Sequence, residues 1–524
     1  MDFYDKSSIH QILIKPIKVF GFPKAKDKLE ALNKLRHDAD LGDINYIFPL
    51  ILTKNALSLT AAQIAAGVMN RIEDKTWNRV YDQVKYTKID EKSMVSLLDF
   101  EPDITIHLLG VASLNSRGYV REKALKLISG IKHPSAIPYV FLRLNDWVVS
   151  IRNLAEHILK KMLTAENIGL FINHFDVIDR LQYSVRVNLK DIKREIIDFL
   201  KDDSFSEIVI NQLKHPQVKT RLFCYELLIE RIVKDDKIIT YALQDKSFEV
   251  RMWLVQAISV LEPKTQYAII EKLIQDKSAK VKTAVLREYE NVVCLKFRDR
   301  LEGLLVDENA SVREDARFIV KKRSIIIDIP GFYRQQILRN PIPGVILGLG
   351  ETGEKRDFDV VCSFRLHEES KIRRAALMAM WYLSPVDALG FVLDALNSDI
   401  PKIRKTVKRL LKKTKMPEIL SAMKEKLSSE DHDISVFALR IICGYGGWQA
   451  LEAILFTICN KQEADFSEVK NLLNSWLNRA TSLFSRPDRV TENTILSLFE
   501  VVRQKGLISE RNINELQFAI ATRR

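Results

Sequence analysis

The feature that most constrains the fold of this chain is a phrase of about 31 residues that recurs along most of its length. Its clearest copy runs from Asp307 to Lys321, where an Asp in a polar turn precedes Val312-Arg313, and Ala, Ile and Val follow the valine at plus four, plus seven and plus eight. Apolar residues at this spacing share one face of an α-helix. The recurrence predicts a repeat array, in which each repeat packs only on its neighbours.

Each copy is marked by a β-branched residue that is usually followed by Arg or Lys. The markers are Val120, Ile151, Val218, Val250, Val281, Val312, Ile372, Ile403 and Ile434. Most steps between them are 31 or 32 residues, and the gaps of 67 and 60 residues each leave room for about two repeats. An alanine follows many markers at plus four, which predicts that helices approach one another closely there. We therefore expect about 13–14 repeats.

Prolines recur at a constant phase of the repeat. Pro134, Pro263, Pro385 and Pro417 stand 13 or 14 residues after a marker. Proline is tolerated at the first position of a helix, where its missing N–H would be unpaired in any case. Each repeat is therefore predicted to consist of two antiparallel helices, joined by a short turn that contains Asp.

Composition agrees with a large helical protein. The chain has 524 residues, of which 47% are hydrophobic, and only 18 Gly and 15 Pro for turns. The sequence contains no run of 18 apolar residues, which a membrane-spanning helix would need. The first residues lack the basic-then-apolar order of a secretion signal. The five cysteines are odd in number and far apart, as is typical of reduced core thiols. We expect a cytoplasmic location.

The pattern predicts three regions. We expect an N-terminal cap segment over residues 1–24, the repeat array over 25–450, and a C-terminal helical cap over 451–524. Within the array the pattern is degenerate around 75–103, 163–205 and 325–357. The last of these intervals is interpreted as a degenerate repeat that bends the array, or alternatively as a groove or hinge between two sub-arrays.

The phrase Asp-x4-Val-Arg-x2-Ala, together with the phased prolines, resembles the HEAT-repeat family, including its HEAT-like, phycobilisome-lyase-type repeats. The segment Leu347–Gly353 also looks like the glycine-punctuated turn between repeats of that family. The resemblance covers roughly residues 25–450. It implies an all-α, armadillo-like right-handed superhelix, an α-solenoid whose second helices line a concave surface that holds other macromolecules. A minority of the family are enzymes, among them alkylpurine DNA glycosylases and bilin lyases.

The Arg or Lys that follows each marker would stand near the N-terminus of the second helix of its repeat, where the helix dipole disfavours a cation. We expect the turn Asp of the same or the adjacent repeat to accept its hydrogen bonds, which would form a structural ladder. The expected members are Arg121, Arg152, Arg251, Arg313, Arg373 and Arg404, with Asp245, Asp276, Asp307 and Asp399. In the looser copy at Val218, the base would be Lys219.

Motifs that carry chemistry are absent from the sequence. It has no H-x-x-x-H, paired C-x-x-C, Gly-Lys-Ser/Thr loop or G-x-S-x-G elbow. The nine histidines are scattered without partner spacing, and His133, His215 and His432 fall in turns between helices. We therefore assign no catalytic residue, no metal site and no cofactor. The sequence favours a non-enzymatic protein over an enzyme.

Charge is the one positive indication of a partner. The net charge is +13, and the densest cluster of cations, between Lys402 and Lys415, contains no acid. On a helix, Ile403, Val407, Leu410 and Leu411 would face the core. Four cations would point away from it, and we call them the basic stripe: Lys402, Lys405, Arg409 and Lys412. A second basic knot, Lys321-Lys322-Arg323, ends the clearest repeat.

The sequence is compatible with three functions. A scaffold that binds a protein partner on its concave face is favoured, because a long repeat array without a chemical motif offers a large surface. A nucleic-acid-binding protein, in which the basic stripe on the concave face contacts phosphates, is the alternative, and the resemblance allows it to be an enzyme similar to the DNA-repair glycosylases of the family. Bases could stack on Trp147, Trp253 or Trp381 if these rings are exposed, although a tryptophan at helical spacing usually packs in the core. A bilin-lyase-like enzyme is third.

Overall fold

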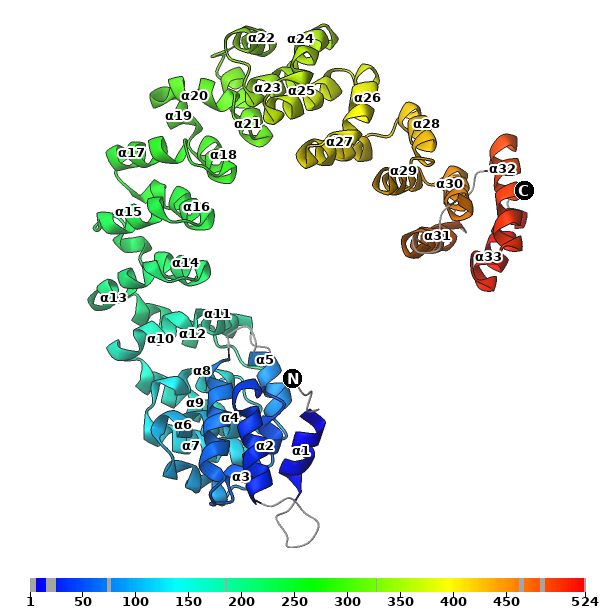
Figure 1. Cartoon of the computed structure of the whole chain (residues 1–524). Coiled ribbons are helices and arrows are strands. Elements are labelled where there is room, and N and C mark those ends of the chain that lie inside the picture. Colours follow the sequence, from blue (N-terminus) through cyan, green and yellow to red (C-terminus); the bar gives the residue numbers. More distant parts are fainter. Residues whose placement is uncertain are drawn as a thin grey trace. The chain divides into compact units, whose positions relative to one another are not determined.

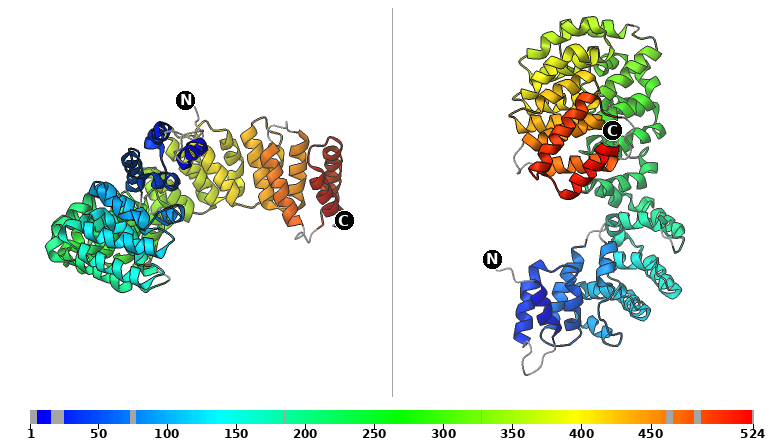
Figure 2. Two further views of the ribbon diagram at one scale, coloured as in Figure 1. Left: turned by 90° about the horizontal axis from the view of Figure 1, so that it is seen from below. Right: turned by 90° about the vertical axis from the view of Figure 1, so that its right-hand side faces the viewer.

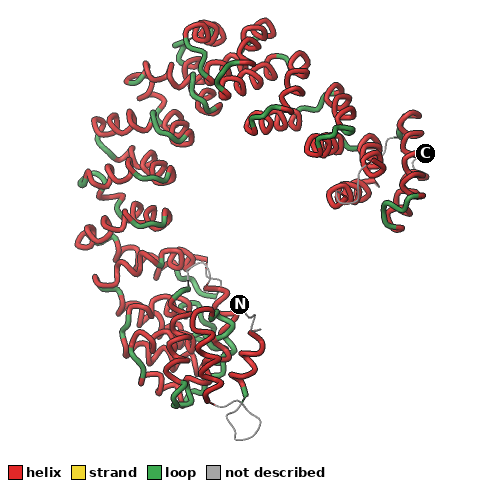
Figure 3. Tube along the Cα trace, in the orientation of Figure 1, coloured by secondary structure: helices red, strands yellow, loops and turns green. Residues whose placement is uncertain are grey.

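The computed structural model describes residues 6–15, 25–72, 77–183, 186–326, 328–460, 466–480 and 486–522. In these ranges the regular structure consists of α-helices and short 3-10 helices, with no β-strand (Figure 3). The predicted all-α fold class is confirmed. Among the described helices, none combines the length and the apolar character that a bilayer crossing requires.

The chain divides into two compact units, Met1–Ile269 and Ile270–Arg524, with α17 (Pro263–Leu273) running across the division (Figure 1). The helices of the first unit are α1 (Lys6–Ile14), α2 (Ala25–Asp38), α3 (Ile44–Ile51), α4 (Ser58–Asn70), α5 (Trp77–Val84), α6 (Pro102–Ser113), α7 (Gly118–Ile131), α8 (Ile137–Arg143), α9 (Val149–Met162), α10 (Ile168–Asn173), α11 (Phe175–Arg180), α12 (Lys190–Leu200), α13 (Ser206–Asn211), α14 (Val218–Leu227), α15 (Asp236–Gln244) and α16 (Phe248–Ala257).

The second unit continues the same alternation of helices. Its members are α18 (Ala279–Glu288), α19 (Glu290–Lys296), α20 (Arg298–Leu305), α21 (Ala310–Lys322), α22 (Ile329–Arg339), α23 (Pro343–Thr352), α24 (Phe358–Cys362), α25 (Ser370–Leu383), α26 (Pro385–Asp394), α27 (Pro401–Lys413), α28 (Pro417–Lys426), α29 (His432–Tyr445), α30 (Gly447–Asn460), α31 (Phe466–Ala480), α32 (Arg489–Gln504) and α33 (Glu510–Thr522).

Successive helices form the predicted pairs, and the second helices of neighbouring pairs pack on one another. In the second unit α20 packs on α21, α22 on α23 and α28 on α29, while α25 contacts both α23 and α27 (Figure 1). Figure 2 shows the helices of this unit, in green to red, from two further sides. In eight of the nine marked repeats the marker is the third residue of its helix, and the exception is Val218, which is the first residue of α14. Val250, Val281 and Val312 are fully buried. One buried stripe on each second helix therefore joins the core of one repeat to the next.

The phased prolines begin the first helices, as predicted. Pro263, Pro385 and Pro417 are the first residues of α17, α26 and α28, and Pro134 opens the 3-10 turn that leads into α8. Proline at this position also ends the preceding turn, because it lacks the N–H that would continue an earlier helix. These residues therefore mark where the first helices of these four repeats start.

Two local predictions from the sequence are wrong. In the degenerate interval 163–205, the sequence pattern over Phe171–Asp179 predicts an irregular connection, but this stretch falls within the short helices α10 and α11, which are separated at His174. The glycine segment Leu347–Gly353, expected to be a turn, lies almost wholly inside α23. Its glycines serve close packing instead of a turn.

The close packing is visible at two positions of α23. A Cβ on Gly348 would stand 2.1 Å from Cε1 of Tyr333, and one on Gly350 would stand 2.4 Å from Cα of Ala379 in α25. Real Cβ atoms are never this near to another heavy atom. The helices α23 and α25 therefore approach backbone to backbone, which only glycine permits.

The regions predicted to depart from the array are also helical where they are described. Residues 325–357 hold the complete pair α22 and α23, except that residue 327 lies outside the described ranges. Residues 75–103 contain α5 and the 3-10 helix Ser93–Asp99, with 73–76 outside. The N-terminal cap segment shows α1, and its residues 1–5 and 16–24 lie outside. In the C-terminal cap, 461–465, 481–485 and 523–524 lie outside.

Candidate binding groove on the second helices

Four second helices of the second unit line one groove, whose volume is about 660 Å³. The helices α21, α23, α25 and α27 follow one another as the second helices of the array (Figure 1), and each contributes residues to the groove. The side chains that matter for its chemistry are Arg313, Leu347, Glu351, Arg374, Met378, Tyr382, Lys402, Lys405 and Arg409. Most of these are far apart in the sequence and meet only through the stacking of helix pairs.

The basic stripe lies on α27, which separates its two faces cleanly. Ile403, Val407, Leu410 and Leu411 are buried, whereas the four cations of the stripe are exposed. Three of them, Lys402, Lys405 and Arg409, line the groove. Lys412 instead lines the neighbouring pocket, together with Arg440 and Trp476.

The groove carries cations that nothing on the described residues neutralises. Lys402 and Lys405 have no ion pair or side-chain hydrogen bond among these residues, and Arg409 only approaches Sδ of Met378 at 3.8 Å. Arg374 also has no carboxylate partner among them. At the rim, Glu308 is 3.5 Å from Lys371 and is exposed. The groove thus has a surplus of positive charge.

Beneath these cations lies a compact ionic network. Arg313 is only 1% exposed, and its guanidinium binds both carboxylate oxygens of Glu351 while Nη1 donates to the main-chain oxygen of Asp307 at 2.6 Å. Arg317 donates to Oε2 of the same glutamate at 2.7 Å. Two arginines therefore neutralise Glu351, so this carboxylate does not offset the charge of the basic stripe.

Arginines near the start of the second helices share one contact that the sequence did not predict. In seven repeats, Nη1 of an arginine donates at 2.6 to 3.0 Å to the main-chain oxygen of the residue six positions earlier, which lies in the inter-helix turn. The pairs are Arg121–Asn115, Arg152–Asp146, Arg221–His215, Arg251–Asp245, Arg313–Asp307, Arg373–His367 and Arg404–Ser398. The base therefore fastens its own turn through the backbone.

The side chain of the same turn residue has a separate role. Its acceptor atom takes the main-chain N–H two residues later, as Asp307 does for Asn309, Asp276 for Ser278 and His367 for Glu369. Such turns are formed by Asp and Asn and tolerate other acceptors. An imidazole, an amide or a hydroxyl can thus replace the carboxylate, which explains why a search for Asp alone misses several turns.

Carboxylates at the turn position also link neighbouring repeats. Asp146 is bound by Arg121, Asp245 by Arg221 and Asp307 by Lys282, each base lying 24 or 25 residues earlier. The base and the carboxylate belong to consecutive repeats. The linkage is charge-assisted and partly shielded from water, so it is stronger than an exposed ion pair.

Two assignments from the sequence are displaced by the structure. In the repeat of α14 the third helical residue is the buried Thr220, so Arg221 makes the ladder contacts and Lys219 is 74% exposed. Asp399 is also exposed, because the turn position of its repeat is occupied by Ser398. Both positions depart from the repeat phrase, because threonine replaces the valine or isoleucine in one and serine replaces the aspartate in the other.

The other predicted contacts with a polyanion are mostly occupied. Lys322 and Arg323 hold Glu290 at 2.8 and 2.9 Å and keep the pKa of that carboxyl below its ordinary value. Trp381 is buried, and Trp253 packs against Tyr225. Trp147 is 70% exposed, but it lies in the first unit and not in the groove.

Comparison with known proteins gives likenesses of low similarity. No family model matches the chain, and no curated protein does. Among solved structures, Kap121p is 10% identical with a TM-score of 0.34, and the match covers 97% of this chain and 64% of Kap121p. The karyopherin Kap121p bound to the SUMO protease Ulp1p is 10% identical with a TM-score of 0.33, and the match covers 95% of this chain and 65% of that protein. Kap95p in a study of RanGDP is 11% identical with a TM-score of 0.25, and the match covers 98% of this chain and 69% of Kap95p.

This chain spans about two thirds or less of the length of Kap121p in these matches. TM-scores of this size carry nothing about function, and the partners named belong to those proteins. The fold follows from the chain itself. Repeated helix pairs, most of them with a buried marker at the third residue of the second helix and an Arg or Lys at the fourth, make this an all-α array of helix-pair repeats.

Proposed function

We propose that this protein is a non-catalytic helical-repeat scaffold that binds an acidic segment of a protein partner in the groove of α21, α23, α25 and α27. The observation that carries the proposal is the set of unneutralised cations, Lys402, Lys405 and Arg409, beside the exposed face of Met378 and Tyr382. A segment that alternates acidic and apolar residues would satisfy both. The expected cytoplasmic location stays a prediction.

A protein segment fits this groove better than a nucleic acid does. The groove offers one half-exposed aromatic ring, Tyr382, whereas single-stranded nucleic acids are usually held by several stacked rings along a charged track. The cations also lie beside apolar side chains, which a peptide can cover and a phosphate backbone cannot. Nucleic acid remains the second candidate, because the basic stripe extends to Lys412 beyond the groove.

The first test is charge reversal in the groove. We expect Lys402/Lys405/Arg409→Glu to weaken binding of a labelled peptide of alternating Glu and Leu roughly tenfold to a hundredfold, since three ion pairs are lost and replaced by repulsion. Fluorescence anisotropy on the full chain measures this. Lys272/Lys277/Arg298→Glu changes the net charge equally at exposed positions outside the groove and should bind like the wild type.

Equal weakening of peptide binding in both variants would show that only net charge matters, and it would overturn the proposal that the groove is the binding site. Labelled DNA and RNA, measured at about 50 and 200 mM salt, decide the alternative. A site that engages four phosphates should lose roughly a hundredfold in affinity over this range. If DNA or RNA binds in this way, binds more tightly than the peptide, and is released by Lys402/Lys405/Arg409/Lys412→Glu, the partner is a nucleic acid and the protein-binding proposal fails.

A further inference from the structure

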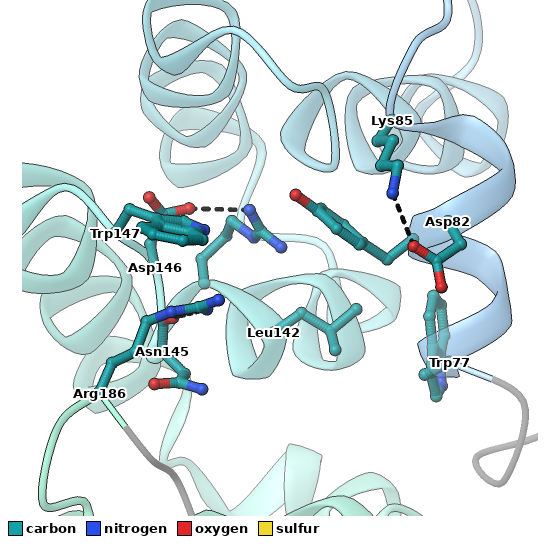
Figure 4. Close-up of a pocket in the computed structure, with 10 residues that line it drawn as sticks. Trp77, Asp82, Lys85, Leu142, Asn145, Asp146, Trp147 and Arg186 are labelled. Atoms are coloured by element: carbon teal, nitrogen blue, oxygen red, sulfur yellow. Dashed lines mark hydrogen bonds and ion pairs between the residues drawn. The ribbon is translucent and has the colours of Figure 1, made fainter.

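A second pocket of different chemistry lies in the first unit, where α5 faces the turn between α8 and α9 (Figure 4). Its volume is about 440 Å³. Figure 4 shows Trp77 on one side, Asn145 and Trp147 on the other, and Leu142 between them. Tyr81, Arg143 and Arg186 complete the part of the lining that concerns us.

The buried groups at the floor of this pocket, two guanidinium groups and one carboxylate, carry one more positive charge than negative. Asp146 is 2% exposed, and its carboxylate accepts from Arg121 at 2.8 Å and from Arg143 at 2.8 Å. These arginines are 5% and 7% exposed, so two buried guanidinium groups share one carboxylate. Burial lowers the pKa of Arg143, and the positive charge of Arg121 lowers it further, in spite of the nearby carboxylate of Asp146.

Hydrogen bonding at the pocket is incomplete as well. Nε of Arg143 and Oδ1 of Asn145 are both buried and have no hydrogen-bond partner in the structure. Buried polar atoms in folded proteins nearly always have one, and each exception costs free energy. An unpaired donor and an unpaired acceptor on residues two apart call for a ligand group that can accept from one and donate to the other.

The pocket also offers an aromatic surface. Trp147 is 70% exposed, and the guanidinium of Arg186 stacks over it at 4.1 Å from the ring centre. Nη1 of Arg186 also donates to the main-chain oxygen of Asn145 at 3.2 Å, which holds the stacked arrangement in place. Large exposed aromatic rings beside a pocket are the usual anchors of protein interfaces.

The remaining charges at the rim cancel. Lys85 is 2.7 Å from Asp82, and Figure 4 shows this pair on the side of the pocket opposite Trp147. The surplus is therefore the single charge at Arg143 together with the solvated Arg186. A carboxylate, with its single negative charge, matches the one buried charge at Arg143, since Arg186 is solvated and stacks on Trp147.

We propose that this pocket binds an acidic residue of an extended peptide, with its carboxylate toward Arg143 and a main-chain N–H toward Oδ1 of Asn145. The neighbouring apolar or aromatic side chain of the peptide packs against Trp147 and Leu142. Because Nε of Arg143 and Oδ1 of Asn145 are covered in the free chain, the peptide shifts the side chains over them as it enters. The site rests on the proposed protein-binding function and adds a separate subsite to it.

The test is selection of displayed random seven-residue peptides on the full chain. We expect the wild type to enrich peptides that carry Asp or Glu next to an aromatic residue, and Trp147→Ala to lose this enrichment at least tenfold. Tyr119→Ala is the matched control, because this ring is 79% exposed and does not line the pocket. Absence of enrichment, or equal enrichment on Trp147→Ala, overturns the proposal.

A selected peptide then separates the individual contacts. Replacing its acidic residue by Gln or Asn should weaken binding about tenfold, and Asn145→Asp should weaken the acidic peptide similarly because it adds a further carboxylate beside Asp146. If the neutral peptide binds as well as the acidic one, Arg143 has no part in recognition and the proposal fails. A single-stranded oligonucleotide that displaces the peptide and binds more tightly would likewise overturn it.

The groove variant Lys402/Lys405/Arg409→Glu keeps this test independent of the function proposed above. It should retain the selected peptide, since its changes all lie in the second unit. Loss of the Glu-Leu peptide with retention of the selected peptide would support both sites. Retention of the Glu-Leu peptide in the groove variant would overturn the groove alone.

Discussion

Replacing Asp146 by asparagine is expected to destabilise the first unit by about 3–5 kcal/mol, the cost of breaking a buried ion pair from one side. The carboxylate accepts four hydrogen bonds, two from Arg121, one from Arg143 and one from the main-chain N–H of Val148 at 3.0 Å. The amide keeps the size but removes the charge that holds two buried guanidinium groups. Hydrogen exchange of α7, α8 and α9 in the full chain would measure the loss.

Asp82→Asn is the matched control for Asp146→Asn. Asp82 also pairs with a base in the same unit, but its side chain is 70% exposed, and exposed pairs contribute about 0–1 kcal/mol. Protection in α7 to α9 should therefore stay close to that of the wild type. If both variants lose the same protection from exchange, the buried ion pairs of Asp146 contribute no more stability than the exposed pair of Asp82.

The same carboxylate predicts how the first unit responds to acid. Burial alone would raise the pKa of Asp146, but the hydrogen bonds from Arg121 and Val148 and the charge of Arg143 outweigh it and hold the pKa below its ordinary value. A depressed pKa means that the carboxylate stabilises the fold above the unfolded value of about 3.9 and loses this effect as the pH falls through the folded value. Between about pH 5 and pH 2, protection of α7 to α9 should therefore fall more steeply in the wild type than in Asp146→Asn.

The second large effect is expected from Gly350→Ala in α23. The new Cβ would stand 2.4 Å from both Cα and Cβ of Ala379, so α23 and α25 must separate. Overpacking of this kind costs about 1–3 kcal/mol, and more where backbone is in the way. Urea denaturation and hydrogen exchange in the second unit should both show this loss of stability. Binding of the Glu-Leu peptide should weaken with it, because both helices line the groove.

Gly390→Ala serves as the control for this substitution. Gly390 lies in α26, where a Cβ would meet nothing within 4 Å. Alanine should stabilise this helix by about 0.5–1 kcal/mol, since glycine is the poorer helix former. Opposite signs for the two substitutions are the expected result. Destabilisation of equal size would show that glycine content, and not the α23–α25 contact, sets the effect.

The repeat architecture could be predicted because its signals are local. A marker, an alanine and a proline at fixed phase specify a buried stripe and the start of a helix, and the structure places Val312, Ala316 and Pro385 accordingly. The turn residue could not be predicted by type, since Asp307, His367 and Ser398 all accept a main-chain N–H there. A shared geometry with several residue types leaves no single letter to search for.

The candidate sites were predictable only in part. The stripe on α27 is visible in sequence because its four cations are near neighbours on one helix. Glu351 and Arg374, in contrast, join the groove from helices whose own sequences carry no such signal. The pocket at Trp147 depends on two unpaired atoms and on an arginine about forty residues away, Arg186, which become related only once the chain is folded.

The backbone contact at Gly350 and Ala379 has a consequence for the thermodynamics of binding. Two helices that touch without intervening side chains have few alternative packings, so this wall of the groove has little conformational entropy to lose when a ligand arrives. The exposed lysines of α27 are the mobile part, and fixing each long side chain costs about 0.5–1.5 kcal/mol. Most of the entropic cost of recognition therefore falls on the partner segment and on these side chains.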